Sequence, residues 1–103
     1  MSLSQEQRKR YRTIGHDLNP LVTIAEKGLA ETVLAEIDRA LNDHELIKIK
    51  VNVADRDEKT ALIEQACEQT GATLIQSIGR VALLLRKAKK PNPKLSNLTR
   101  LKP

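Results

Sequence analysis

The stretch ELIKIKVNV, residues 45–53, constrains the fold more than any other part of the sequence. Its β-branched apolar residues alternate with Lys48 and Lys50, and a period of two is that of a β-strand. One face of this strand is therefore predicted to be buried, and the other to carry positive charge. Such a strand needs further elements that cover its apolar face and pair with its edges.

Three helices are predicted from apolar residues that recur every three or four positions and from residues typical of helix ends. The predicted helices run from Ser4 to Gly15, from Leu29 to Leu41 and from Asp55 to Gly71. Ser4 and Gln7 have the spacing of a capping box, and Asp55 and Glu58 form a second cap-like pair. A glycine suits the C-terminal end of the first and third helices, because it adopts the left-handed conformation found there. The second helix is followed by a polar break at residues 42–44.

Three more apolar stretches, at residues 21–25, 72–78 and 80–86, predict the remaining strands. Gly79 separates the last two, which are expected to form a hairpin. The order is then α-β-α-β-α-β-β, in which crossover connections allow the first three strands to be parallel and the hairpin adds an antiparallel neighbour. The sequence thus predicts an α/β fold, a four-stranded mixed sheet with two helices packed on one face plus an N-terminal helix.

A chain of 103 residues is long enough for one domain with a modest core. We expect residues 1–87 to form this domain and residues 88–103, rich in proline and basic residues, to form a flexible basic tail. The N-terminus lacks the apolar stretch of a signal peptide, and no apolar run reaches the length of a membrane span. The single cysteine permits no internal disulfide, so a cytoplasmic protein is expected.

The charge balance points to a polyanionic partner. Eighteen Lys and Arg against thirteen Asp and Glu give a net charge of +5 at pH 7, which favours nucleic acid or an anionic membrane surface. Tyr11 is the only aromatic residue; its ring could stack on a base, but its spacing from Ile14 favours packing on the sheet. With so few aromatic side chains, recognition is expected to depend on the shape and phosphates of a nucleic acid rather than on base stacking.

Three segments, LNPLVTIAEKGL, EIDRALNDHELIKIKV and TGATLIQSIGRVALLLR, occur along the chain in the predicted order of elements. Together they resemble the YhbY-type CRM family (chloroplast RNA splicing and ribosome maturation), over residues 4–86. The resemblance implies an RNA-binding domain related in fold to the C-terminal domain of bacterial initiation factor 3. It also implies a role with structured ribosomal RNA of the large-subunit precursor. We expect a monomer with no cofactor, no metal, no membrane partner and no small-molecule substrate.

The family carries a GxxG loop between the first strand and the next helix, which aligns here with Ala25, Glu26, Lys27 and Gly28. In such a loop the free amides of the helix N-terminus can donate hydrogen bonds to an RNA phosphate, and Lys27 adds positive charge. Ala25 replaces the first glycine, and Glu26 and Glu31 bring negative charge that costs about 0.3–1 kcal/mol at an exposed position. Two interpretations stay open: a phosphate-binding loop, or a turn in which Gly28 only caps the helix.

Further candidate RNA contacts are cations of the sheet and of the first helix. They are Lys48, Lys50, Arg80 and Arg86 from the predicted strands, and Arg8 and Arg12 from the helix. Lys48 and Lys50 point the same way, and Gln76, Arg80 and Arg86 are expected to join them from neighbouring strands. The alternative interpretation is an ordinary solvated sheet face. Arg8 and Arg12 are four residues apart and therefore share one face of their helix.

Two functions other than RNA binding also stay open. A DNA-compacting protein of the Alba type would present a similar sheet and charge. A protein-interaction module would use three leucines spaced by three residues in the tail, Leu95, Leu98 and Leu101.

Catalysis is not expected from the distribution of reactive side chains. His16 and His44 lie at predicted helix ends, where histidine commonly interacts with the helix dipole. Cys67 falls on the apolar face of the third helix and is interpreted as a small core residue.

Overall fold

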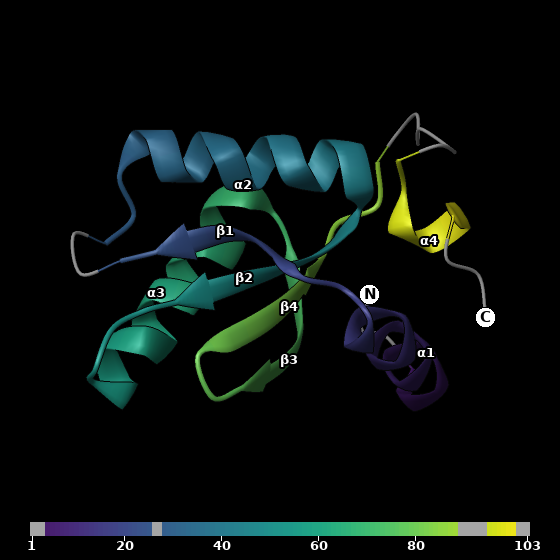
Figure 1. The fold of residues 1–103 in the computed structure, drawn as a ribbon, viewed down its shortest axis with the longest axis horizontal. Helices are drawn as coiled ribbons and strands as arrows, with labels where there is room; N and C mark the ends of the chain where they lie inside the picture. Colours follow the sequence, from purple (N-terminus) through teal and green to yellow (C-terminus); the bar gives the residue numbers. More distant parts are fainter. Residues whose placement is uncertain (1–3, 26–27, 89–94, 101–103) are drawn as a thin grey trace.

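The computed structural model of the protein describes residues 4–25, 28–88 and 95–100, and a four-stranded mixed sheet forms its centre (Figure 1). The strands are β1 (Pro20–Ile24), β2 (Leu46–Val51), β3 (Thr73–Ile78) and β4 (Val81–Leu85), and the helices are α1 (Gln5–His16), α2 (Glu31–His44), α3 (Arg56–Thr70) and α4 (Asn97–Arg100). The spatial order is β1-β2-β4-β3, with β1 parallel to β2 and β4 antiparallel to both its neighbours. The predicted fold class is confirmed: β1, β2 and β3 share one direction, and β4 lies between β2 and β3.

Helices α2 and α3 cover one face of the sheet, and this face holds the larger core (Figure 1). Ile37 and Leu41 of α2 pack against Ile49 and Val51 of β2, and all four side chains are fully buried. Burying one such side chain contributes about 1.5–3 kcal/mol, so this layer is a major source of the stability of the domain. The alternation in β2 therefore buries the residues that its period predicts.

Helix α1 packs on the opposite face, over one end of the sheet (Figure 1). Tyr11 and Ile14 are buried with Leu46 and Leu83, which confirms that Tyr11 packs on the sheet. The helix was expected to end at Gly15, but it continues to His16. Gly15 instead allows α1 to lie close to β4, because a Cβ at this position would lie 2.6 Å from Leu83 Cδ2.

The predicted capping residues Ser4, Asp55 and Gly71 are confirmed, although at Asp55 the cap is made with Asp57 rather than with Glu58. In the capping box of α1, the hydroxyl of Ser4 accepts from the amide of Gln7 at 3.1 Å, and the Ser4 amide donates to Gln7 Oε1 at 3.0 Å. Asp55 Oδ1 accepts from the amide of Asp57 at 2.9 Å at the start of α3. Gly71 ends α3 in the left-handed conformation, with φ of 74°.

The boundaries of α2 differ from those predicted. The helix begins at Glu31 rather than Leu29, because the chain first turns at Gly28, which has φ of 79°. It also continues through the polar residues up to His44 and ends at Glu45, which has φ of 63°. The polar residues 42–44 therefore belong to the last turn of the helix, where Asn42 accepts a hydrogen bond from Arg86.

Glu45 joins the end of α2 to the C-terminal part of the chain. Its side chain is buried, and its two carboxylate oxygens accept from the Ser96 hydroxyl and from the amide of Ala88, each at 2.6 Å. The side-chain amide of Asn97 donates to the carbonyl of Leu46 at 2.6 Å. These contacts place α4 beside the start of β2.

The tail predicted at residues 88–103 is described at residues 95–100, where Leu98 packs against the cluster around Tyr11. The other tail residues beyond Ala88, including Leu101, lie outside the described part, and the division of the chain after residue 87 stays a prediction. None of the helices in the described ranges is both long and apolar enough to cross a membrane.

Candidate nucleic-acid interface

The carboxyl ends of β1 and β2 meet the β3–β4 turn at one edge of the sheet, on the left of Figure 1. The amide of Asn52, just after β2, donates to the carbonyl of Ile24 at 2.7 Å, and the amide of Val51 donates to the carbonyl of Arg80 at 2.6 Å. We call this region the loop edge; its described residues are Ala25, Gly28, Asn52, Gly79 and Arg80. Ala25 and Arg80 lie on opposite sides of the end of β2, because the end of β1 bonds to Asn52 and Arg80 bonds to Val51.

Gly28 closes a tight turn at the loop edge. Its amide donates to the carbonyl of Ala25 at 2.9 Å, and its φ of 79° is one that residues with a side chain rarely adopt. Two exposed residues, Ala30 and Glu31, then begin α2, and Ala30 makes no side-chain cap hydrogen bond. Glu26 and Lys27 lie outside the described residues, so phosphate binding by this loop stays a prediction.

Three cations surround the loop edge. Arg80 is exposed and donates from Nη1 to Asn52 Oδ1 at 3.1 Å, while Lys59 of α3 donates to the carbonyl of Gly79. Lys50, exposed on β2, pairs in register with the residue that follows Arg80. The sequence reasoning missed Lys59, because a single lysine in the first turn of a helix carries no signal of what the turn faces.

The face of the sheet opposite α2 and α3 carries both predicted strand lysines. The two rows of residues across this face are Lys48–Leu83–Gln76 and Lys50–Val81–Ile78. Ile78 is 66% exposed, whereas Leu83 is buried beneath α1. Helix α1 therefore covers one end of this face and leaves the end nearer the loop edge open.

Arg8 and Arg12 lie along β3, as one face of α1 allows. Arg8 is half-buried and donates from Nη1 to the carbonyl of Leu74 at 3.1 Å, so part of its role is to hold α1 on the sheet. Arg12 is exposed one turn further on, beside Gln76 and Ile78. Four residues of an α-helix span about 6 Å along its axis, and two residues of a β-strand span about 6.6 Å. Arginines four residues apart on α1 can therefore lie beside residues two apart on β3.

A groove runs between α1 and β3, and we call it the α1–β3 groove. Its deeper part, a hollow of about 260 Å³, is lined by Arg12, His16, Lys48, Gln76, Ile78, Val81 and Leu83. A shallower part continues over Lys9, Thr13 and Asp17. The groove thus has an apolar floor from the sheet and cations on its walls.

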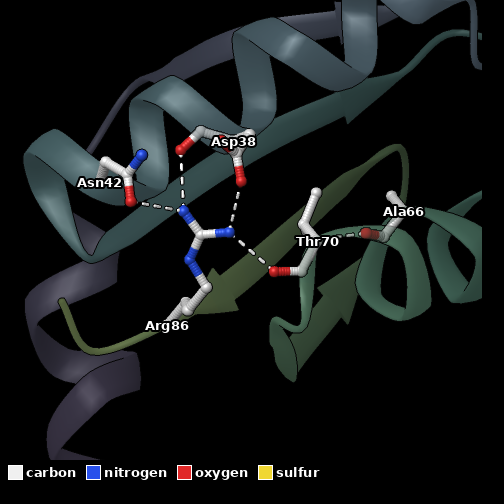
Figure 2. Close-up of polar contacts among 5 residues, drawn as sticks. All are labelled: Asp38, Asn42, Ala66, Thr70 and Arg86. Carbon is white, nitrogen blue, oxygen red and sulfur yellow. Dashed lines mark hydrogen bonds and ion pairs between the residues drawn. The ribbon is translucent and has the colours of Figure 1, made fainter. Parts of the chain in front are cut away.

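Arg86 does not share a face with Lys48 and Lys50, contrary to the prediction. Its guanidinium lies on the helix-covered side, where it contacts Asp38 Oδ1 at 2.6 Å and Asn42 Oδ1 at 2.8 Å (Figure 2). It also donates to the carbonyls of Thr70, at 2.7 Å, and Asp38, at 2.9 Å. Arg86 therefore ties β4 to the ends of α2 and α3.

The other described cations named above make no ion pair with a carboxylate of the described residues. Among the side chains that the structure describes, Arg86 and Asp38 form the only ion pair. Arg12, Lys50 and Arg80 are exposed and remain available to an anionic partner.

In the described part of the chain, we find no arrangement of reactive side chains that resembles a catalytic site. Cys67 packs against the larger core, and burial, together with the nearby charge of Glu64, raises the pKa of its thiol. A raised pKa keeps the thiol protonated and unreactive. No group of three or more His, Cys, Asp and Glu side chains with metal-site geometry occurs within the described ranges.

Comparison with known proteins identifies the family. The model of the CRS1 / YhbY (CRM) domain matches residues 3–86. The chain belongs to the CRM domain family. The match spans α1 to β4, and so this CRM domain includes the loop edge and the α1–β3 groove.

Relatives of this CRM domain occur in several bacteria. A Pseudomonas aeruginosa protein named "Probable RNA-binding protein" is 54% identical, over 97% of this chain and 96% of its own length. A Haemophilus influenzae protein named "RNA-binding protein" is 45% identical, over 82% of this chain and 86% of its own. The solution structure of a hypothetical protein from Staphylococcus aureus superposes with a TM-score of 0.75, at 31% identity, over 86% of this chain and 93% of its own.

Proposed function

We propose that this CRM domain binds structured ribosomal RNA during maturation of the large ribosomal subunit, acting as a cytoplasmic monomer without a cofactor. Its relatives in Pseudomonas and Haemophilus carry the name of RNA-binding proteins. The family membership supports an RNA partner, and the surface charge supports contact with its phosphates.

The observation that carries the proposal is a set of exposed cations that have no carboxylate partner in the described part of the chain. Lys50 lies at the open end of the sheet face, Arg80 lies in the turn just beyond it, and Arg12 lies beside Gln76 and Ile78 of the edge strand β3. Within the described residues none of the three is ion-paired, so contact with phosphate would not require an existing ion pair to break. Phosphate contacts of this kind give shape-dependent binding with little sequence preference.

The loop at residues 25–28 contributes to the same surface. Gly28 gives the turn its left-handed conformation, and the turn leads directly into α2, whose first amides are able to donate hydrogen bonds to a phosphate. Lys27 of the same loop adds one positive charge to the proposed surface. In this proposal the loop adds to the lysines of the sheet instead of replacing them.

Crosslinking in cells, followed by sequencing of the attached RNA, tests the proposed target. Reads concentrated on large-subunit ribosomal RNA are expected. Reads scattered over messenger RNA, or an absence of crosslinked RNA, would contradict it.

Reversing one charge tests the proposed surface. We expect Lys50→Glu to weaken binding to a ribosomal RNA hairpin about tenfold, because it removes one phosphate contact and adds repulsion. Arg39→Glu is the matched control: it changes the net charge equally, at an exposed position on α2, across the sheet from Lys50. If the two variants lose RNA affinity equally, only net charge matters, and the proposed binding surface is contradicted.

Competition with duplex DNA separates this function from DNA compaction of the Alba type. The CRM domain is expected to prefer structured RNA over duplex DNA of the same length and sequence. Displacement of the RNA by equal amounts of DNA would favour the alternative.

A further inference from the structure

The α1–β3 groove has features that binding to RNA phosphates alone does not require. Its floor is apolar: Ile78 is 66% exposed, and Val81 lies beside it in register on β4. Phosphate and ribose gain nothing from an apolar floor. A large apolar side chain exposed among cations instead suits the face of a nucleobase.

The walls of the groove supply groups that recognise a base. Gln76, half-buried on β3, carries an amide that makes no hydrogen bond to any other residue in the described part of the chain. A side-chain amide offers both donors and an acceptor, as the edge of a base requires. Arg12 lines the same hollow from α1, and its planar guanidinium is able to stack on a base.

The two parts of the groove match the two parts of a nucleotide. The deeper hollow of about 260 Å³ is somewhat smaller than the roughly 300–1,000 Å³ of pockets for drug-sized ligands, which suits one flat ring system. The shallower part adds Lys9 and Thr13, a cation and a hydroxyl that suit a phosphate. Asp17 at its far end disfavours a second phosphate there, so the groove suits one nucleotide rather than a continuous strand.

We propose that the α1–β3 groove binds one unpaired nucleotide of the RNA, with its base between Arg12 and Ile78, its edge on Gln76 and its phosphate near Lys9. The base must be unpaired, because in an A-form duplex the base faces are stacked and side chains do not reach the deep groove. This inference rests on the proposed function and adds to it a preference for bulges or loops in the bound RNA.

Two RNA hairpins with the same stem test the proposal, one fully paired and one with a single bulged nucleotide. The wild-type protein is expected to bind the bulged hairpin about tenfold more tightly, since an inserted base adds contacts of the kind found in single-strand sites. A third hairpin, with an abasic residue at the bulge, keeps the flexibility of the backbone and lacks the base. It is expected to bind like the paired hairpin, and binding as tight as that of the normal bulge would overturn the proposal.

Variants in the groove locate the base. Ile78→Ser and Gln76→Ala are each expected to lower the bulge preference below about twofold and to leave affinity for the paired hairpin unchanged. Leu21→Ser is the matched control, because Leu21 is 50% exposed on the other edge strand of the sheet. Thermal unfolding of each variant shows that it is folded at the temperature of the binding assay.

The outcomes distinguish the two proposals. If the wild-type protein binds none of the hairpins, the proposed function itself is contradicted. Binding without a bulge preference, or a preference that survives both groove variants, would overturn only the inference about the groove, and an apolar contact for a protein partner would then be the better account of Ile78.

Discussion

At the scale of single residues, Arg86 gives the clearest prediction. Its guanidinium donates four hydrogen bonds, to the side chain and carbonyl of Asp38, to Asn42 and to Thr70 (Figure 2). We expect Arg86→Ala to lower the free energy of unfolding by about 2 kcal/mol, a value kept modest because Asp38 is half exposed. Urea unfolding measures the change.

Two further variants make the Arg86 experiment specific. Arg86→Lys keeps the charge without the planar fork, so it is expected to recover less than half of the lost stability. Arg39→Ala removes an exposed arginine from α2, the helix that carries Asp38 and Asn42. It is expected to change the free energy of unfolding by at most about 0.5 kcal/mol. If Arg86→Ala is as harmless as Arg39→Ala, the hydrogen bonds of Arg86 do not hold the helices.

The assignment of residues to a face of the sheet was predictable only within one strand. The alternation in β2 places Lys48 and Lys50 together without any knowledge of their neighbours. Whether Arg86 joins them depends on the register between strands, in which Lys48 lies opposite Leu83. A shift of one residue in this register would have moved Arg86 to the lysine face, and nothing in the local sequence fixes it.

At the scale of the elements, the packing of α1 depends on a glycine. Gly15 lies so close to β4 that a Cβ would be 2.6 Å from Leu83 Cδ2. Gly15→Ala is expected to destabilise the protein by about 1 kcal/mol, because crowding against the buried Leu83 side chain outweighs the gain in helix propensity. Thermal or urea unfolding measures the loss.

A second substitution shows whether crowding is the cause. In a Leu83→Val background the facing side chain is shorter, so Gly15→Ala is expected to become neutral or stabilising. A loss that is equal in both backgrounds would mean that the cost of alanine at this position has nothing to do with Leu83.

Helix ends were predictable at Ser4, Asp55 and Gly71, and not where neither a capping side chain nor a glycine marks the end. Ser4 and Asp55 have oxygens that reach the first turn, and their helices begin where the sequence indicates. Helix α2 has Ala30 at its N-cap and ends at Glu45, whose positive φ no sequence rule would assign to glutamate. The burial of Glu45 against Ser96 and Ala88 explains why this conformation is held, and these contacts span 51 and 43 residues of sequence.

At the scale of the whole molecule, the two faces of the sheet are used differently. Helices α2 and α3 close one face with the main core, and the other face is left partly open, with Lys48, Lys50 and the α1–β3 groove. The composition predicts the excess of positive charge but not this separation, which arises because the two crossover helices, α2 and α3, both pack on the same face of the sheet. The candidate surface is therefore a property of the topology as much as of the cations themselves.

This arrangement predicts the salt dependence of RNA binding. If about five phosphates are neutralised, by cations such as Arg12, Lys27, Lys48, Lys50 and Arg80, the logarithm of the association constant should fall against the logarithm of salt concentration with a slope of roughly −3.5 to −4.5. Fluorescence anisotropy with a labelled ribosomal RNA hairpin, titrated over a series of salt concentrations, gives the slope.

The charge variants then separate the open face from the rest of the surface. Lys50→Glu is expected to make the slope shallower by about one, since each phosphate contact contributes close to one unit. Arg39→Glu is expected to leave the slope unchanged, because counterions are released only where cations meet phosphates. A slope near zero for the wild-type protein would mean that binding does not depend on these cations, whatever the affinity, and that the RNA is held by apolar contact and shape alone.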